Sequence, residues 1–280
     1  MDPIIKIVII SFVFAIIGYL FGSILFAAIF ARIFKKDIRK LGSTNPGATN
    51  FSRVISPQLS ILVSLCDMAK CSLSVLICWI IYRYTIYPDF TPINDIVPME
   101  NNITYQYESL YTLVFLGGFF AILGHCFPVT FLIVLLFSKE HYKRAIDYKG
   151  GKGVSATVGL IIMISPWIFL IIFAVWFFTI IISRYSSLSS LLAITLSMFL
   201  ILIPNLNFLY LFDNSVLYNP GLYAPRDDVA KISYEFNSDL IFGLFIIMFC
   251  STFLVLMRHK SNIYRLLHGK ESKIRKHKMN

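Results

Sequence analysis

Residues 42–53 form a polar, glycine-bearing segment between two long apolar runs. The members that could contact an anion are Gly42, Ser43, Asn45, Gly47, Thr49, Asn50 and Arg53. Hydroxyls and amides donate hydrogen bonds to anionic oxygens, glycines let the backbone approach a ligand, and a guanidinium offers a planar fork to phosphate. Because a bilayer core has no water for bare backbone, such a segment lines a cavity or faces the cytosol. The pattern predicts a phosphate site at a membrane surface; an ordinary Asn-Pro-Gly turn is the alternative.

A second candidate, residues 149–153, opens an apolar run with the sequence Lys-Gly-Gly-Lys-Gly. Its members are Gly150, Gly151, Lys152 and Gly153 beside Lys149. Glycines expose N–H groups, a helix start adds positive potential and a lysine supplies charge, so the segment resembles a phosphate cradle. It is not a Walker loop, because position 146 is isoleucine and a glycine follows the lysine. A flexible basic loop beside a membrane span is the alternative.

Polar groups also occur inside apolar runs. His125 lies in one such run, where a histidine is costly unless it has a partner and is therefore a functional candidate. A backbone carbonyl could equally satisfy it. Asp67 and Lys70 lie three residues apart, so they can pair on one helix face. An internal ion pair is the structural alternative to a functional role for these two.

The last candidates follow apolar runs near the C-terminus. His259 and Asn262 are three residues apart and share a helix face, with Glu271 beyond them. Ser186 and Ser187 lie in a short polar stretch between two other apolar runs. A basic stop segment with a solvated tail is the alternative for the C-terminal group.

The elements that must position these groups are membrane helices. The chain of 280 residues is 57% apolar and only 14% charged, with a mean hydropathy of +0.74; a soluble domain carries roughly 25% charged residues. Several apolar runs reach or approach the ~20 residues that span a bilayer as a helix. The first run is too long for a signal peptide and is followed by basic residues. We expect an all-α, polytopic transmembrane helix bundle, a single domain over residues 1–280.

Charge sets the expected topology. Lys and Arg concentrate in 31–53, 138–152 and 258–280, whereas 84–108 and 212–239 are acidic, and positive loops stay in the cytoplasm. We therefore expect two external loops, a cytoplasmic tail, the N-terminus outside and the C-terminus inside, in the cell membrane. About seven spans satisfy every loop, near residues 4–33, 58–83, 108–136, 154–165, 166–183, 187–211 and 238–257. Five crossings, with the fourth and fifth of these taken as one helix, are the weaker alternative. All candidate polar loops then face the cytoplasm.

The net charge and the cysteines also indicate whether the chain binds nucleic acid, a metal or a cofactor. The formal net charge of +10 comes from loops beside the spans, so anionic headgroups or an anionic substrate explain it without nucleic acid. None of the five cysteines forms a Cys-x-x-Cys pair, and we expect no metal, disulfide or cofactor. We also expect no obligate protein partner.

Together these motifs resemble the bacterial acyl-phosphate:glycerol-3-phosphate acyltransferases over most of the chain. The matching stretches are Gly22–Ile24, Asp37–Asn50, Arg53, Asp67–Lys70, Leu123–Val129, Lys149–Gly153, Tyr185–Leu188, Arg258–His259, Asn262–Ile263 and Glu271. The family usually has glycine where Thr44 and Cys71 stand, and residues around 134–146 are an insertion. The resemblance implies a groove that opens to the cytosol and the membrane.

The resemblance also implies a reaction. An acyl group would pass from an acyl-phosphate to the 1-hydroxyl of sn-glycerol 3-phosphate, giving 1-acyl-sn-glycerol 3-phosphate (lysophosphatidic acid) and phosphate, the first step of membrane phospholipid synthesis. Ser43 and Arg53 of the first motif, Lys152 of the second, and His259 and Asn262 of the third are the expected catalytic residues.

Substrate contacts follow from the same resemblance. We expect Arg53, Lys152 and one of the serines at 186–187 to hold glycerol 3-phosphate, and loop 42–50 to take the acyl-phosphate. The expected substrate-binding residues are Gly42, Asn45, Gly47, Thr49, Asn50, Gly150, Gly151, Gly153, Ser186, Ser187, His125 and Glu271. His259 would orient groups or transfer a proton, a task that a substrate phosphate could equally perform. A membrane transporter of a phosphate ester remains the alternative function.

Overall fold

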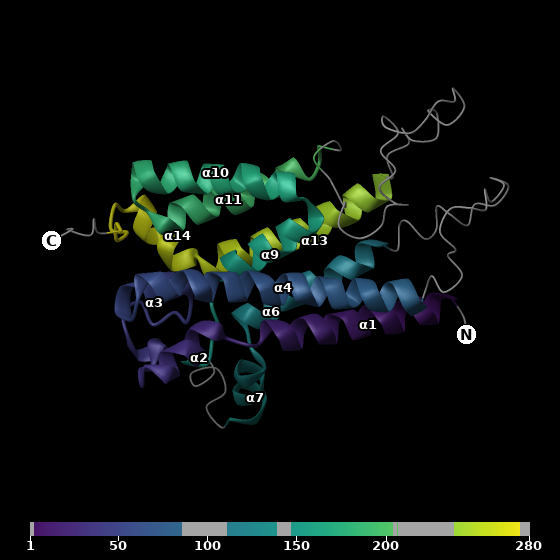
Figure 1. The fold of residues 1–280 in the computed structure, drawn as a ribbon, viewed down its shortest axis with the longest axis horizontal. Helices are drawn as coiled ribbons and strands as arrows, with labels where there is room; N and C mark the ends of the chain where they lie inside the picture. The colour runs from purple at the N-terminus through teal and green to yellow at the C-terminus, as the bar shows by residue number, and fades with distance from the viewer. Residues whose placement is uncertain (1–2, 86–110, 139–146, 204–205, 207–237, 275–280) are drawn as a thin grey trace.

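The computed structural model describes residues 3–85, 111–138, 147–203, 206 and 238–274, and every regular element in them is a helix (Figure 1). The predicted all-α class is therefore confirmed for this part of the chain. The expected external loops at 84–108 and 212–239 lie almost entirely outside the described residues. The helices are α1 (Pro3–Gly22), α2 (Phe26–Ile33), α3 (Ala48–Val54), α4 (Pro57–Thr85), α6 (Val114–Cys126), α7 (Val129–Phe137), α9 (Val154–Ile164), α10 (Pro166–Ser183), α11 (Ser186–Leu200), α13 (Ser238–Arg258) and α14 (Lys260–Leu267), with 3-10 turns η1 (Ile38–Lys40) and η2 (Tyr111–Leu113).

Fewer helices than the seven expected spans are long enough to cross a bilayer. Within the described residues four stretches are long and apolar enough, namely Ile5–Ile33, Pro57–Tyr82, Pro166–Ser183 and Leu240–Arg258. The pair α6 and α7, bent by 60°, makes a fifth if it is one span. The shortfall from the predicted seven lies in α9 and α11, which have 11 and 15 residues where about 20 are needed. Region 154–183 does form two helices, because Pro166 begins α10 and the Ser165 hydroxyl accepts the N–H of Ile168.

Two helix breaks lie against each other. The first apolar run, expected as one span, is broken between α1 and α2 around Ile24, and α6 ends before Pro128, which lacks the N–H that would continue it. The Tyr19 hydroxyl donates to the carbonyl of Phe127 at 2.5 Å, and the Val129 N–H donates to Ser23 Oγ at 3.1 Å. Beyond these breaks α2 and α7 leave the main helix direction on the same side of the bundle (Figure 1).

Small residues and apolar side chains hold the bundle together. A Cβ at Gly18 of α1 would lie 2.0 Å from the carbonyl oxygen of Gly117 in α6, so only glycine permits this approach. The main core gathers buried residues of α1, α4, α6, α9, α10, α11 and α13. A second, smaller core consists of Ala27, Ala31, Ile38, Phe51 and Val63. It ties α2, η1 and α3 to α4 and so supports residues 42–53. Helices α2, α3 and α14 lie toward one end of the bundle, on the left in Figure 1.

Candidate active site

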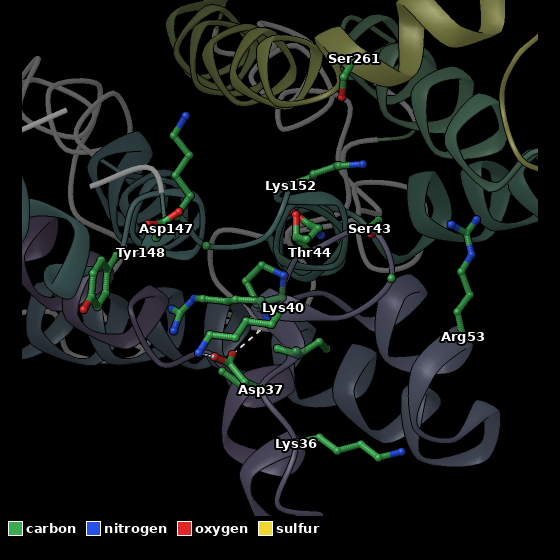
Figure 2. Close-up of a pocket in the computed structure, with 18 of the residues that line it drawn as sticks. Lys36, Asp37, Lys40, Ser43, Thr44, Arg53, Asp147, Tyr148, Lys152 and Ser261 are labelled. Carbon is green, nitrogen blue, oxygen red and sulfur yellow. Dashed lines mark hydrogen bonds and ion pairs between the residues drawn. The ribbon is translucent and has the colours of Figure 1, made fainter. Parts of the chain in front are cut away.

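An open cleft of about 1350 Å³ lies at this end of the bundle (Figure 2). It is lined by most of residues 42–47 (the first loop), by Lys149, Gly150 and Lys152 of residues 149–153 (the second loop), and by residues around the α13–α14 junction. Among the described lining residues eleven are basic and two, Asp37 and Asp147, are acidic. The basic ones are Arg32, Lys35, Lys36, Arg39, Lys40, Arg53, Lys149, Lys152, Arg258, Arg265 and Lys270. Such a concentration of positive charge favours an anionic ligand.

The first loop is held by a buried asparagine. Asn50 is 1% exposed; its Oδ1 accepts the N–H of Ser43 at 2.9 Å, and its Nδ2 donates to the carbonyls of Ile38 and Leu41 at 3.2 and 2.9 Å. Gly42 has φ +58, and a Cβ there would lie 2.4 Å from Asn50 Oδ1. The predicted ligand contacts at these two positions thus differ in kind: Gly42 lines the cleft, whereas the Asn50 amide braces the loop.

Other residues of the first motif also fall into two groups, those that line the cleft and those that do not. Ser43, Asn45 and Arg53 line the cleft together with Lys152, and Figure 2 labels Ser43, Arg53 and Lys152 around it. The exposed Thr49 lies on α3, and it and Gly47 are outside the set of described lining residues. Gly47 instead precedes α3, where a Cβ would lie 2.9 Å from Asn45 Nδ2.

The second loop packs directly on the end of α6. The Gly150 N–H donates to the carbonyl of Cys126 at 3.0 Å. A Cβ at Gly150 would lie 1.8 Å from the His125 carbonyl oxygen, and one at Gly151 would lie 2.1 Å from His125 Nε2. Gly153, at φ +89, is the N-cap residue immediately before α9. These glycines permit close packing, and Gly150 also lines the cleft.

Arg258 clamps the other side of this loop, a role that the motif analysis missed. Its guanidinium donates to the carbonyl of Gly150 at 2.8 Å and to that of Gly151 at 3.0 and 3.2 Å. The only sequence signal was its place next to His259 in the third motif. Backbone carbonyls leave no trace in a pattern of side chains, so this contact needed the structure.

Lys152 belongs to a hydrogen-bonded chain of groups that joins the second and third motifs. Its Nζ donates to Asn262 Oδ1 at 2.6 Å, and Asn262 Nδ2 donates to Glu271 Oε1 at 2.8 Å. The same carboxylate accepts a hydrogen bond from Ser187 Oγ at 2.7 Å. Its Oε2 atom accepts another from Arg265 Nε, also at 2.7 Å. The structure thus brings four predicted site residues together, although among the described residues only Lys152 of these four lines the cleft. Ser186, at the start of α11, lies outside the lining set too.

Burial and neighbouring charges shift the pKa values in this network. Burial lowers the pKa of Lys152 to about 8, with Arg265, Arg258 and Arg53 acting in the same direction and Glu271 opposing them. For Glu271 burial opposes ionisation, but hydrogen bonds from Ser187, Asn262 and Arg265 outweigh it, so the pKa of the carboxyl falls below its usual value. The network therefore links an ionised carboxylate, through Asn262, to a lysine whose pKa is about 8.

His259 is buried at the junction of α13 and α14. It is 3% exposed, and its Nδ1 lies 2.8 Å from the Val255 carbonyl. Since a carbonyl only accepts, Nδ1 carries the proton and Nε2 is left as an acceptor. Burial, with the charge of Lys152 acting in the same direction, lowers the pKa of His259 to about 4. It is absent from the described lining residues.

His125 is not placed in the cleft either. It is 4% exposed, with Nδ1 2.9 Å from Lys70 Nζ. Asp67 and Lys70 form the internal ion pair that was the alternative for them, at 2.9 Å. Across the described residues no group of three or more His, Cys, Asp or Glu side chains could hold a metal ion.

The fold and cleft define a class: a helical, multi-pass membrane protein with a strongly cationic cleft between glycine-bearing loops. Comparison with known proteins makes this specific. The model of the family described as "Glycerol-3-phosphate acyltransferase" matches residues 12–269. The chain therefore belongs to the glycerol-3-phosphate acyltransferase family, as its motifs predicted, and it is an acyltransferase rather than a transporter.

Individual relatives agree with this assignment. The chain is 36% identical over 263 residues to the glycerol-3-phosphate acyltransferase of Malacoplasma penetrans (strain HF-2), covering 93% of this chain and 92% of that protein. It is 34% identical over 260 residues to that of Mycoplasma pneumoniae (strain ATCC 29342 / M129 / Subtype 1), covering 92% of each. The crystal structure of PlsY (YgiH), an integral membrane glycerol 3-phosphate acyltransferase in its glycerol 3-phosphate form, has a TM-score of 0.62 at 23% identity, covering 95% of this chain and 96% of that one. The fold is therefore shared.

Proposed function

We propose that this acyltransferase uses an acyl-phosphate as donor and glycerol 3-phosphate as acceptor, and releases phosphate and 1-acyl-sn-glycerol 3-phosphate (lysophosphatidic acid). The observation that carries the proposal is a single cleft that Ser43 and Arg53 of the first motif line together with Lys152 of the second. Two phosphate-bearing substrates account for two motifs and eleven basic lining residues. The similar PlsY structures, described as a glycerol 3-phosphate form and a lysophosphatidic acid form, support the acceptor and the product.

Lys152 and Arg53 hold the phosphate of glycerol 3-phosphate in this proposal. Lysine supplies a point charge and arginine a planar pair of donors, which together suit a phosphate. Ser186 or Ser187 was expected to add a hydroxyl. Ser187 already donates to Glu271, so its contribution is to hold that carboxylate, and neither serine is among the described residues that line the cleft.

The first loop receives the acyl-phosphate through its side chains. The backbone N–H groups of Ser43, Thr44 and Gly47 already donate to groups in or beside the loop, namely Asn50 Oδ1 and the carbonyls of Leu41 and Asn45. The hydroxyl of Ser43 and the amide of Asn45 line the cleft and can donate to the donor phosphate. Positioning and charge stabilisation then supply much of the rate, because an acyl-phosphate is already activated.

The hydroxyl proton goes to a phosphate oxygen in our proposal. The 1-hydroxyl oxygen of glycerol 3-phosphate bonds to the acyl carbon, the bond from that carbon to the phosphate oxygen breaks, and the leaving phosphate takes the proton. A pKa of about 4 makes His259 a weak base, and its Nδ1 is engaged with Val255. His259 therefore serves to orient the α13–α14 junction next to Asn262.

The membrane arrangement completes the proposal. We infer seven crossings, with α9 and α11 as short spans, the N-terminus outside and the C-terminus inside, in the cell membrane. The eleven basic lining residues support a cytoplasmic cleft, since positive loops stay inside. An active site there would meet a soluble acceptor from the cytosol and a lipid-like donor from the membrane.

Phosphate release by purified protein given palmitoyl-phosphate and glycerol 3-phosphate tests this function. We expect release by the wild type and a loss of at least about 100-fold in kcat/KM for Lys152→Ala, as expected when a positioned charge is removed. Lys260→Ala is the matched control, because Lys260 is exposed and is not a described lining residue. An inactive wild type, or equal activity of both variants, would refute the proposal.

A further inference from the structure

A buried charged cluster lies inside the bundle, and the proposed chemistry does not use it. Lys70 Nζ is 2.9 Å from Asp67 Oδ1 and 2.9 Å from His125 Nδ1. The side chains of Lys70, Asp67 and His125 are 2%, 3% and 5% exposed. Burying charges between membrane helices is costly even when they are paired, and such groups commonly serve a function. None of the three belongs to the described residues that line the cleft.

On one side this cluster holds the start of α2. Lys70 Nζ also donates to the carbonyl of Ile24 at 2.6 Å, in the break between α1 and α2, and lies 5.9 Å from the centre of the Phe26 ring. The ammonium group of Lys70 thus hydrogen-bonds with Ile24 and His125 and is ion-paired with Asp67. From Phe26 the chain continues through α2 and η1 into the first loop, so Lys70 fixes the point from which that loop is built.

On the other side the cluster supports the second loop. Because His125 Nδ1 accepts from the ammonium group of Lys70, the ring proton lies on Nε2. That Nε2 edge faces Gly151, where a Cβ would lie 2.1 Å away, and the His125 carbonyl faces Gly150 equally closely. The loop that carries Lys152 therefore rests directly on His125. Any shift of this ring must move the loop, since protein interiors have no free space to absorb it.

We propose that Asp67, Lys70 and His125 form a positioning cluster that sets the second loop, and hence Lys152, at a fixed place relative to the first loop. Lys70 is its centre, because it contacts the break before α2 and the histidine beneath the second loop at once. The cluster acts through the loops and not on a substrate. The inference rests on the proposed function, because it is tested through the kinetics of the proposed acyl transfer.

The double variant Asp67→Asn/Lys70→Met tests the proposal without leaving a buried charge unpaired. We expect the KM for glycerol 3-phosphate to rise at least about tenfold, whereas general destabilisation would lower the active fraction and leave KM unchanged. Ser74→Ala is the matched control: Ser74 is buried one turn further along α4 and donates to the carbonyls of Cys71 and Gly117, away from the cluster. Its KM should stay within about twofold of wild type.

A second pair of variants isolates the link from Lys70 to His125. His125→Asn keeps an acceptor near the position of Nδ1, and His125→Leu removes it. We expect the asparagine to retain more of the wild-type affinity, and the leucine to behave like the double variant. If the double variant does not fold, the comparison of these two His125 variants tests the positioning cluster instead.

Two results would overturn the positioning cluster. One is a folded double variant, with wild-type thermal stability in detergent, whose KM and kcat are unchanged. The other is an equal rise in KM for His125→Asn and His125→Leu. A wild-type enzyme that releases no phosphate would instead refute the proposed function, so the two failures are distinguishable.

Discussion

Lys152 Nζ lies 2.6 Å from Asn262 Oδ1, although the two residues are 110 positions apart in the chain. Asn262 in turn donates a hydrogen bond to Glu271, whose carboxylate also accepts hydrogen bonds from Ser187 and Arg265. The contact joins the second motif to the third and fixes the ammonium group at the wall of the cleft. An amide oxygen orients the lysine without neutralising it, so the charge remains available to a phosphate.

Substitutions of Asn262 should separate orientation from charge. We expect Asn262→Ala to raise the KM for glycerol 3-phosphate about tenfold, because the ammonium group loses its partner. Asn262→Asp should be worse, since a carboxylate would neutralise Lys152 and repel Glu271. Steady-state kinetics on both variants checks the order, and an aspartate variant better than the alanine variant would contradict this account.

The alkaline limb of the pH profile should belong to Lys152. Its pKa is lowered to about 8, so the cation that binds phosphate is present below that pH and is lost as the pH rises through it. We expect kcat/KM for glycerol 3-phosphate, which reports the free enzyme, to fall above about pH 8. Arginine stays protonated in this range, so Lys152→Arg should lose the limb even if its activity is low. An unchanged limb in Lys152→Arg would assign the titration to another group.

Thr44 should be a point of backbone strain. It has φ +58, in the left-handed region that a β-branched residue rarely adopts, at a position where the family usually has glycine. We expect Thr44→Gly to raise stability by about 0.5–1 kcal/mol, because the relief of strain exceeds the added entropy of the unfolded chain. Thr49→Gly, within α3, should lower stability instead. Thermal unfolding in detergent measures both, and a loss of stability in Thr44→Gly would show that the threonine is not strained.

Arg258 should be needed as an arginine and not merely as a cation. Two nitrogens of its planar guanidinium, Nε and Nη2, donate to the Gly151 carbonyl, and Nη2 also donates to that of Gly150; a lysine has one nitrogen and cannot reproduce this planar pair of donors. We expect Arg258→Lys to raise the KM for glycerol 3-phosphate about tenfold, as the second loop loosens. Arg184→Lys is a matched control, because the exposed Arg184 lies outside the described cleft lining. Equal KM values for the two variants would show that the clamp is dispensable.

Much of the site could be predicted from the sequence, because its polar motifs stand out against apolar runs. The meeting of Ser43, Arg53 and Lys152 in one cleft follows from motifs whose flanking charges put them on one side of the membrane. The resemblance also singled out Thr44, where the family usually has glycine, and the structure gives this residue a positive φ.

The sequence could not show which of the polar side chains line the cleft and which hold the loops in place. Asn50 and His125 have the right chemistry for a ligand, but their partners, the Ser43 N–H and Lys70, are set by tertiary distances. The break at Ile24 was missed for a similar reason: hydrophobicity continues through it, and it is held by the carbonyl's contact with Lys70.

The donor is the central claim, and one comparison tests it directly. Purified enzyme with glycerol 3-phosphate is given either palmitoyl-phosphate or palmitoyl-CoA, and 1-acylglycerol 3-phosphate and free phosphate are both measured. We predict equal amounts of product and phosphate from palmitoyl-phosphate, and no product from palmitoyl-CoA. Product from palmitoyl-CoA, with none from palmitoyl-phosphate, would contradict the account.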